Sequence, residues 1–172
     1  MSVRLLAALL LGASLAGSCS AQGPDEVVLV SREWADLEWT CWNGFDFMCR
    51  IEFPGQTFRD ADGRVATVGP TDMVWRLEVS GSEAECGGDM IRDQTSFFRF
   101  APSGPDETPR QSLVFDDGSA VQLFVKSTTV VWDKCSESVG RWEGVAGTFE
   151  GRTGTYRWTD DGLQIELVLT DS

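Results

Sequence analysis

Among the side chains that commonly do chemistry, this chain has five cysteines, one tyrosine and 27 carboxylates, but no histidine. Without histidine the chain cannot build a Ser-His-Asp or Cys-His nucleophile system, an imidazole general base or a histidine-ligated zinc site. Two of the carboxylates could form a general acid–base pair if the fold brought them together. The missing residue types favour a non-enzymatic protein that holds no cofactor and no metal.

The cysteines indicate export to an oxidising compartment. One of them lies in the N-terminal segment, and the other four are Cys41, Cys49, Cys86 and Cys135. Four thiols allow three pairings, and we predict the sequential one. Cys41 and Cys49 flank the turn signal Asn43-Gly44 and can face each other across a hairpin, while Cys86–Cys135 closes a much larger loop. A four-thiolate zinc site would need paired Cys-x-x-Cys spacing, which the sequence lacks.

Seven tryptophans are many for 172 residues, and we expect most of them in a hydrophobic core. The alternative role for such rings is to line a site for a small apolar or aromatic ligand. Trp75 and Trp142 are the preferred lining residues because each alternates with polar neighbours along a predicted strand, and Tyr156 is a further candidate. Arg76 or Arg141 would anchor the ligand if the opposite strand face pointed inward.

The first 21 residues have the pattern of an export signal. A basic start is followed by an apolar run over residues 5–15 and by small residues from Ala16 to Ala21. The run of about 11 residues is well short of the ~20 needed to span a bilayer. Two processing routes stay open: cleavage after Ala21 with release to the periplasm or medium, or lipidation of Cys19, since Ala16-Gly17-Ser18-Cys19 resembles a bacterial lipobox. The second route would make an outer-membrane lipoprotein.

The net charge of −13 and the pI near 4.3 exclude a nucleic-acid-binding surface and disfavour anionic membranes. Contact with a membrane is therefore expected only through a lipid at Cys19. The sequence leaves the oligomeric state open. An acidic surface of this kind serves either solubility or binding of a basic partner.

The rest of the chain, residues 22–172, is predicted to form a single β-domain. Period-two alternation is clearest over residues 73–79 and 163–169, where apolar side chains share one strand face. The other predicted strands cover residues 27–30, 37–42, 47–53, 56–59, 64–67, 95–100, 113–115, 121–125, 128–132, 141–149 and 155–158. Asp116-Asp117-Gly118 and Asp160-Asp161-Gly162 are hairpin signals. Asp60-Ala61-Asp62-Gly63 is interpreted as a turn rather than a calcium loop, because the third acidic ligand and the closing glutamate are missing.

These short strands and regular turns predict an all-β fold, a single antiparallel up-and-down barrel of about eight strands. A proline-rich stretch at 102–109 is expected to be a mobile loop. The glycine-rich stretch near the C-terminus has a spacing suited to strand bends and close backbone approach; its members are Gly140, Gly144, Gly147, Gly151 and Gly154. A phosphate-binding loop is disfavoured because no Gly-Lys-Ser/Thr ending and no helix follow.

The stretch from Gly140 to Gly147 resembles the late glycine-rich segment of the allene oxide cyclase and dirigent barrel superfamily, which includes small exported bacterial members. Gly140, Trp142, Gly144 and Gly147 fit the later motif positions, whereas Ser138 replaces the first glycine. The resemblance implies an eight-stranded antiparallel barrel. It places no catalytic residue of the plant enzymes on this chain.

Three functions remain in view from the sequence. The leading one is an exported, non-enzymatic barrel that binds a small ligand or acts as a scaffold at the cell envelope. The second is a dirigent-like or cyclase-like isomerase, which would need a wide cavity containing a carboxylate or Tyr156. The third is an envelope interaction protein that uses its acidic surface.

Overall fold

The computed structural model describes residues 26–172 except residues 36, 45, 87, 104–109 and 132–133. The predicted export signal, the lipidation candidate Cys19 and most of the predicted 102–109 loop lie outside the described residues. In the described part of the chain, no helix is long and apolar enough to cross a membrane.

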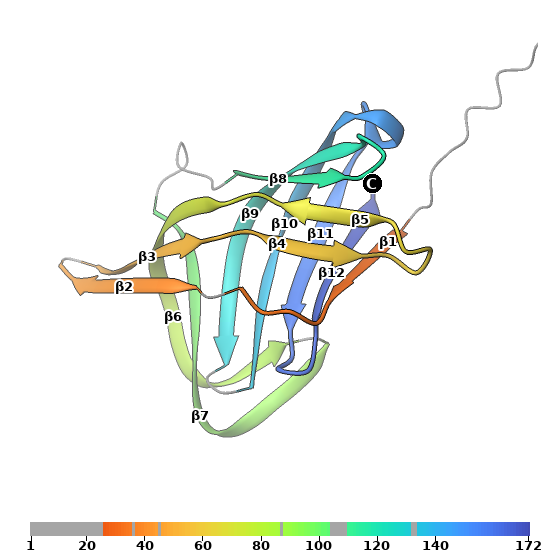
Figure 1. Cartoon of the computed structure of the whole chain (residues 1–172). Helices are drawn as coiled ribbons and strands as arrows, with labels where there is room; N and C mark the ends of the chain where they lie inside the picture. The colour runs from red at the N-terminus through yellow and green to blue at the C-terminus, as the bar shows by residue number, and fades with distance from the viewer. Residues whose placement is uncertain (1–25, 36, 45, 87, 104–109, 132–133) are drawn as a thin grey trace, which may run out of the picture.

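The described residues form a single sheet of twelve antiparallel strands (Figure 1). The strands are β1 (Glu26–Ser31), β2 (Glu38–Asn43), β3 (Phe47–Phe53), β4 (Gln56–Arg59), β5 (Val65–Val68), β6 (Thr71–Cys86), β7 (Asp89–Pro102), β8 (Arg110–Phe115), β9 (Ala120–Val131), β10 (Cys135–Ala146), β11 (Thr153–Asp160) and β12 (Ile165–Asp171). A short 3₁₀ turn, η2 (Gly147–Phe149), follows β10.

Eight of these strands close into a ring, which confirms the predicted antiparallel barrel. Around the ring the order is β9, β10, β11, β12, β1, β4, β5 and β8, and β8 pairs again with β9. Ring neighbours follow chain order, as in an up-and-down barrel. The contact between β1 and β4 is the shortest, since only Val30 and Arg59 are paired there.

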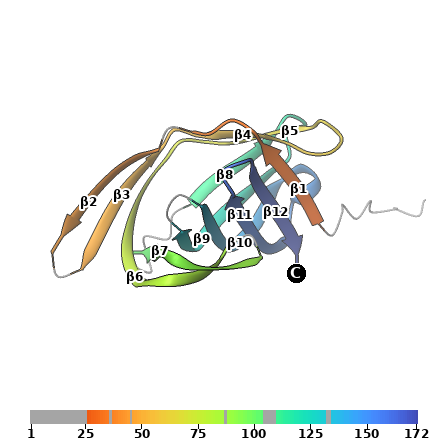
Figure 2. The ribbon, with the colours of Figure 1, turned by 90° about the horizontal axis from the view of Figure 1, so that it is seen from below.

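The other four strands form an outer sheet beside the ring. β9 is long enough to pair with β8 through one half and with β7 through the other. From β7 the outer sheet continues through β6 and β3 to β2 at its edge. Figure 2 shows this sheet curving away from the ring and ending in the projecting β2–β3 hairpin.

A pair of prolines marks the point where the ring passes into the outer sheet. Pro54-Gly55 separates β3 from β4, and Gly69-Pro70 separates β5 from β6. Because Phe53 pairs with Thr71 and Gln56 with Val68, Pro54 lies opposite Pro70. Neither proline can donate a ladder hydrogen bond, so both strands bend at the same level. We call these four residues the double hinge.

The buried face changes at the double hinge. Next to the hinge, the buried positions are odd-numbered in β3 and the start of β6 and even-numbered in β4 and β5: Cys49, Ile51, Phe53, Met73 and Trp75 against Gln56, Phe58, Ala66 and Val68. At Gly55 the backbone has φ 110°, and a Cβ there would lie 2.9 Å from the Val68 carbonyl oxygen. Glycine at position 55 therefore permits the change of face.

Large side chains fill the interior of the ring. The largest fully buried ones include Trp142, Phe58, Phe149, Leu29, Leu113, Leu123, Leu167 and Leu169. Phe149 stacks on Phe115 with ring centroids 5.0 Å apart and meets Trp142 edge-on at 5.9 Å. The interior of the ring is therefore a packed hydrophobic core.

The glycine-rich segment brings backbones into close contact. A Cβ at Gly144 would lie 1.6 Å from the Phe149 carbonyl oxygen, and one at Gly154 would lie 2.0 Å from the Thr170 carbonyl oxygen. Gly140 is similarly close to the backbone of Phe124. Gly147 and Gly151 instead occupy turn positions with positive φ.

Both predicted disulfides are confirmed. Cys41–Cys49 joins β2 to β3 with Cα atoms 4.1 Å apart, and Cys86–Cys135 joins the end of β6 to the start of β10 with Cα atoms 6.4 Å apart. The second bridge thus lies at strand ends rather than within loops. It ties the outer sheet to the ring.

The structure differs from the sequence prediction in the length of several strands. β6 and β7 extend beyond residues 73–79 and 95–100, and β9 joins two predicted strands into one. Leu163 was expected on the apolar face of the last strand but precedes β12 and is 81% exposed.

Candidate functional site

The three aromatic residues predicted to line a ligand site are buried in the core. Trp75 lies on the inner face of the outer sheet, and Trp142 and Tyr156 lie inside the ring. The Trp142 Nε1 donates a hydrogen bond to the Thr170 carbonyl oxygen at 3.1 Å, so the polar atom of this ring is already satisfied. The Trp75 Nε1 and the Tyr156 Oη have no hydrogen-bond partner among the described residues.

Burial keeps the Tyr156 hydroxyl protonated over a wider pH range than that of a free tyrosine. Removal from water disfavours the phenolate and raises the pKa of the Tyr156 hydroxyl well above its ordinary value. The phenol is therefore neutral at physiological pH. A neutral phenol can donate a hydrogen bond but cannot act as a general base.

The two predicted arginine anchors lie on the outside of the molecule. Arg76 is exposed on the outer face of β6. The Arg141 guanidinium lies 3.8 Å from the centre of the Phe124 ring and is paired with Glu143. The structure therefore does not bring the five predicted ligand-binding residues into one site, and their role stays a prediction.

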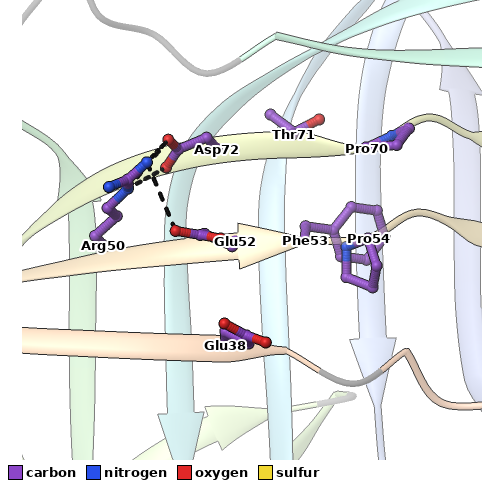
Figure 3. Close-up of a pocket in the computed structure, with 8 residues that line it drawn as sticks. All are labelled: Glu38, Arg50, Glu52, Phe53, Pro54, Pro70, Thr71 and Asp72. Atoms are coloured by element: carbon purple, nitrogen blue, oxygen red, sulfur yellow. Dashed lines mark hydrogen bonds and ion pairs between the residues drawn. The ribbon is translucent and has the colours of Figure 1, made fainter.

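An open hollow of about 420 Å³ lies on the outer face of β2, β3 and β6 beside the double hinge (Figure 3). Pro54 and Pro70 bound it on the hinge side. Its polar wall comes from Glu38 on β2, from Arg50 and Glu52 on β3, and from Asp72 on β6.

Three carboxylates form a row across this polar wall. Glu38 pairs with Glu52 in the β2–β3 register, and Glu52 pairs with Asp72 in the β3–β6 register. Paired residues on antiparallel strands point to the same face, so all three side chains share the outer face. We call Glu38, Glu52 and Asp72 the carboxylate row.

Arg50 is the positively charged residue beside the carboxylate row. Its Nε lies 2.9 and 3.1 Å from the two carboxylate oxygens of Asp72, and its terminal nitrogen lies 3.6 Å from Glu52. The hydrogen bond from Arg50 lowers the pKa of the Asp72 carboxyl below its ordinary value. Glu38 has no ion-pair or hydrogen-bond partner among the described residues. The wall therefore carries three negative charges and one positive charge.

A second hollow of about 340 Å³ adjoins the first and shares Pro54 and Pro70 with it. Trp34 lines it with a ring that is 49% exposed, while its Nε1 donates to the Asp160 carboxylate at 3.2 Å. Glu33 adds a further acidic residue to its lining. The two hollows meet at these prolines, and we call them together the hinge groove.

Gln56 lines the second hollow and has an unused acceptor. Its Nε2 lies 2.6 Å from both the Ser31 hydroxyl oxygen and the Glu33 carbonyl oxygen. A carbonyl oxygen only accepts, so the amide must present its nitrogen to Glu33. The Gln56 side chain is buried, with 6% of the residue exposed, and its Oε1 has no partner among the described residues. A buried acceptor without a donor is costly unless a donor is supplied.

These features together suit an organic cation. Carboxylates attract N–H donors, and the proline and tryptophan surfaces accept an apolar or aromatic body. In the described part of the chain, no three acidic or cysteine side chains are grouped so as to hold a metal ion.

The hinge groove was not found from the sequence. Arg50 and Glu52 alternate with buried residues, which is ordinary for a solvated strand face. The sequence feature that could have indicated the groove is the mirrored order of Pro54-Gly55 and Gly69-Pro70. In a hairpin this order places the two prolines opposite each other. Comparison with protein-family models, curated proteins and solved structures finds no match to this chain.

Proposed function

We propose that this chain is an exported, non-catalytic binding protein that holds a small organic cation with an apolar or aromatic body in the hinge groove. The observation that carries the proposal is the carboxylate row. The row has three acidic side chains beside a single arginine, which pairs with Asp72 and Glu52, whereas Glu38 has no cationic partner among the described residues. An ammonium or guanidinium group of a ligand would neutralise that excess charge.

Export is supported by the two disulfides, which persist in oxidising compartments. The N-terminal sequence pattern adds a signal peptide and delivery to the periplasm or medium. In a lipidated form, Cys19 would hold the barrel and its groove at the outer membrane. Membership of the allene oxide cyclase and dirigent barrel superfamily remains part of this proposal, supported by the glycine-rich segment.

A dirigent-like isomerase is less well supported than a binding protein. Such an enzyme needs a wide interior cavity, whereas Trp142, Phe149 and aliphatic side chains pack the interior of the ring. Tyr156 is held neutral by burial. The described interior thus offers a core rather than a reaction chamber.

Binding of phenethylammonium, with phenylethanol as its neutral counterpart, tests the proposal. The amine should bind and change the intrinsic tryptophan fluorescence through Trp34, and the alcohol should bind more weakly. Glu38→Gln should weaken amine binding about three- to tenfold, as expected for a partly exposed charge-assisted contact. Raising the salt concentration should weaken it further.

Glu78→Gln is the matched control because it removes the same charge from β6. Glu78 is exposed and lies six residues from Asp72, which is ~20 Å along a strand. Equal binding of the amine and the alcohol, or equal loss in Glu38→Gln and Glu78→Gln, would exclude the carboxylate row as the site.

A further inference from the structure

Within the described part of the chain, no strand pairs with the outer edge of β2. β2 ends the strand order of the sheet, and β3 is its only partner among the described residues. All six of its residues are exposed. Trp39 and Trp42 keep 43% and 44% of their surfaces accessible, and Leu37 just before the strand is equally exposed. Exposed tryptophans are typical of interaction surfaces.

This edge lacks the features that usually prevent strands from pairing. Natural edge strands carry proline, lysine, inward-pointing charge or a β-bulge. The sequence from Glu38 to Asn43 has no proline and no lysine, and its register with β3 continues without a shift. Cys41–Cys49 also fixes the strand in its extended form. A strand held in this way loses little conformational entropy when a partner binds.

The disulfide geometry identifies the backbone groups that face outward. Opposed residues whose Cα atoms are near 4.5 Å apart form non-hydrogen-bonded pairs, and Cys41 and Cys49 are separated by 4.1 Å. The N–H and C=O of Cys41 therefore point away from β3. Because this direction alternates along a strand, the N–H and C=O groups of Trp39 and Asn43 also point away from β3. The N–H and C=O groups of Thr40 and Trp42 point toward β3.

The two faces of β2 differ in chemistry. Trp39 lies on the inner face, where its ring centroid is 6.5 Å from that of the buried Phe100. Glu38 lies on the outer face at one end of the carboxylate row. An added strand would thus meet an apolar surface on one side and an acidic one on the other.

We propose that β2 binds an extended segment of a basic partner protein by strand addition. The segment alternates apolar side chains, which pack beside Trp39, with lysines or arginines, which face Glu38 and Glu52. Charge complementarity selects this occupant over a second copy, because each copy carries a net charge of −13. This surface shares Glu38 and Glu52 with the hinge groove, but its backbone contacts are the outward groups of β2, which are not part of the groove.

An eight-residue peptide that alternates lysine and valine is the probe, and a glutamate–valine peptide is its control. Amide hydrogen exchange is followed by NMR in the full exported protein. The lysine peptide should slow exchange at the outward amides of Trp39, Cys41 and Asn43 at least tenfold. The amides of Thr40 and Trp42, which already face β3, should change little. The glutamate peptide should have no effect.

Trp39→Pro and Trp39→Ala separate backbone pairing from ring contact. Proline at an outward-facing edge position removes the N–H that an added strand needs and leaves the β3 ladder intact. Trp39→Pro should therefore weaken lysine-peptide binding at least threefold more than Trp39→Ala. Both variants should keep the two disulfides and unfold cooperatively in urea as the unmodified protein does, which shows that they are folded.

Three results would overturn the proposal. Peptide binding without slowed exchange at Cys41 would show side-chain contact only. Equal binding of the glutamate peptide would remove the charge argument. Slowed exchange that rises with protein concentration in the absence of peptide would identify a second copy as the occupant of the edge.

Discussion

The backbone at Gly144 leaves no room for a side chain, because an added Cβ would meet the Phe149 carbonyl oxygen at 1.6 Å. Gly144→Ala must therefore displace η2 or the start of β11. We expect the free energy of unfolding to fall by about 2–4 kcal/mol, as in other severe steric substitutions. Urea unfolding followed by tryptophan fluorescence measures the change.

Gly118→Ala is the control for this substitution. Gly118 has φ 83° in the β8–β9 turn, with no atom within 4 Å of an added Cβ. Only backbone strain of about 1–2 kcal/mol is expected there. A loss at Gly118 that equals the loss at Gly144 would contradict the close-approach explanation.

The single tyrosine offers a test at the level of one hydroxyl group. The Tyr156 Oη is buried without a partner among the described residues. Tyr156→Phe removes that polar atom and keeps the ring, so we expect the free energy of unfolding to stay equal or to rise by up to about 1 kcal/mol. A loss larger than 1 kcal/mol in thermal or urea unfolding would mean that the hydroxyl has a partner.

The same residue predicts a loss of stability in alkali. The pKa of Tyr156 is raised in the folded protein, so above pH ~10 the unfolded chain releases this proton while the folded one retains it. Stability should therefore fall as the pH rises above ~10, by about 1.4 kcal/mol per pH unit from this group. Tyr156→Phe should show a shallower decline in urea unfolding at the same pH values. Identical slopes would show that Tyr156 is not responsible.

At the scale of elements, the two disulfides should differ in their contribution to stability. They span 8 and 49 residues. In the chain-entropy model such loops contribute about 2.5 and about 4 kcal/mol. The Cys86→Ala/Cys135→Ala variant should therefore unfold at lower urea concentration than the Cys41→Ala/Cys49→Ala variant. The reverse order would show that native-state packing outweighs loop entropy.

Much of the strand pattern was predictable, because turn chemistry is local. β3 and β4 have the predicted bounds, and the Asp-Gly signals at Gly118 and Gly162 do lie between strands. Asn43-Gly44 placed Cys41 opposite Cys49, and the register confirms it. In each case the residues that determine the structure are neighbours in the sequence.

The lengths of the longest strands were not predictable from periodicity. The second half of β6, Ser80–Cys86, is largely polar and exposed, so it carries no apolar alternation. It is extended because β7 pairs with it and Cys86–Cys135 fixes its end. β9 continues through a register shift opposite Val139 and Gly140, where Lys126 interrupts the pattern. Such features depend on partners distant in the sequence.

The whole molecule determines which strands enter the ring and where a site forms. Alternation correctly placed Trp75 and Trp142 on buried faces, but a buried face can serve a core as well as a pocket. That distinction depends on which strands surround it. The hinge groove likewise needs β2, β3 and β6 to be neighbours, which follows from the sheet order and not from any one segment.

The net charge should control self-association of the whole molecule. Near pH 4.3 the net charge approaches zero, and the open edge of β2 is no longer protected by repulsion. Light scattering should show association near this pH and less of it at pH 7. Trp39→Lys should associate less than Glu78→Gln, although both substitutions shift the net charge in the positive direction. Equal association of the two would show that the β2 edge is not involved.

The double hinge also constrains how the long hairpin can pair. Pro54-Gly55 and Gly69-Pro70 match only in the observed alignment, in which proline lies opposite proline. A slip of one residue would place each proline against a residue able to form ladder hydrogen bonds, and it would turn every buried side chain to the opposite face. The two prolines therefore fix the register between the segment that contains β3 and β4 and the segment that contains β5 and β6.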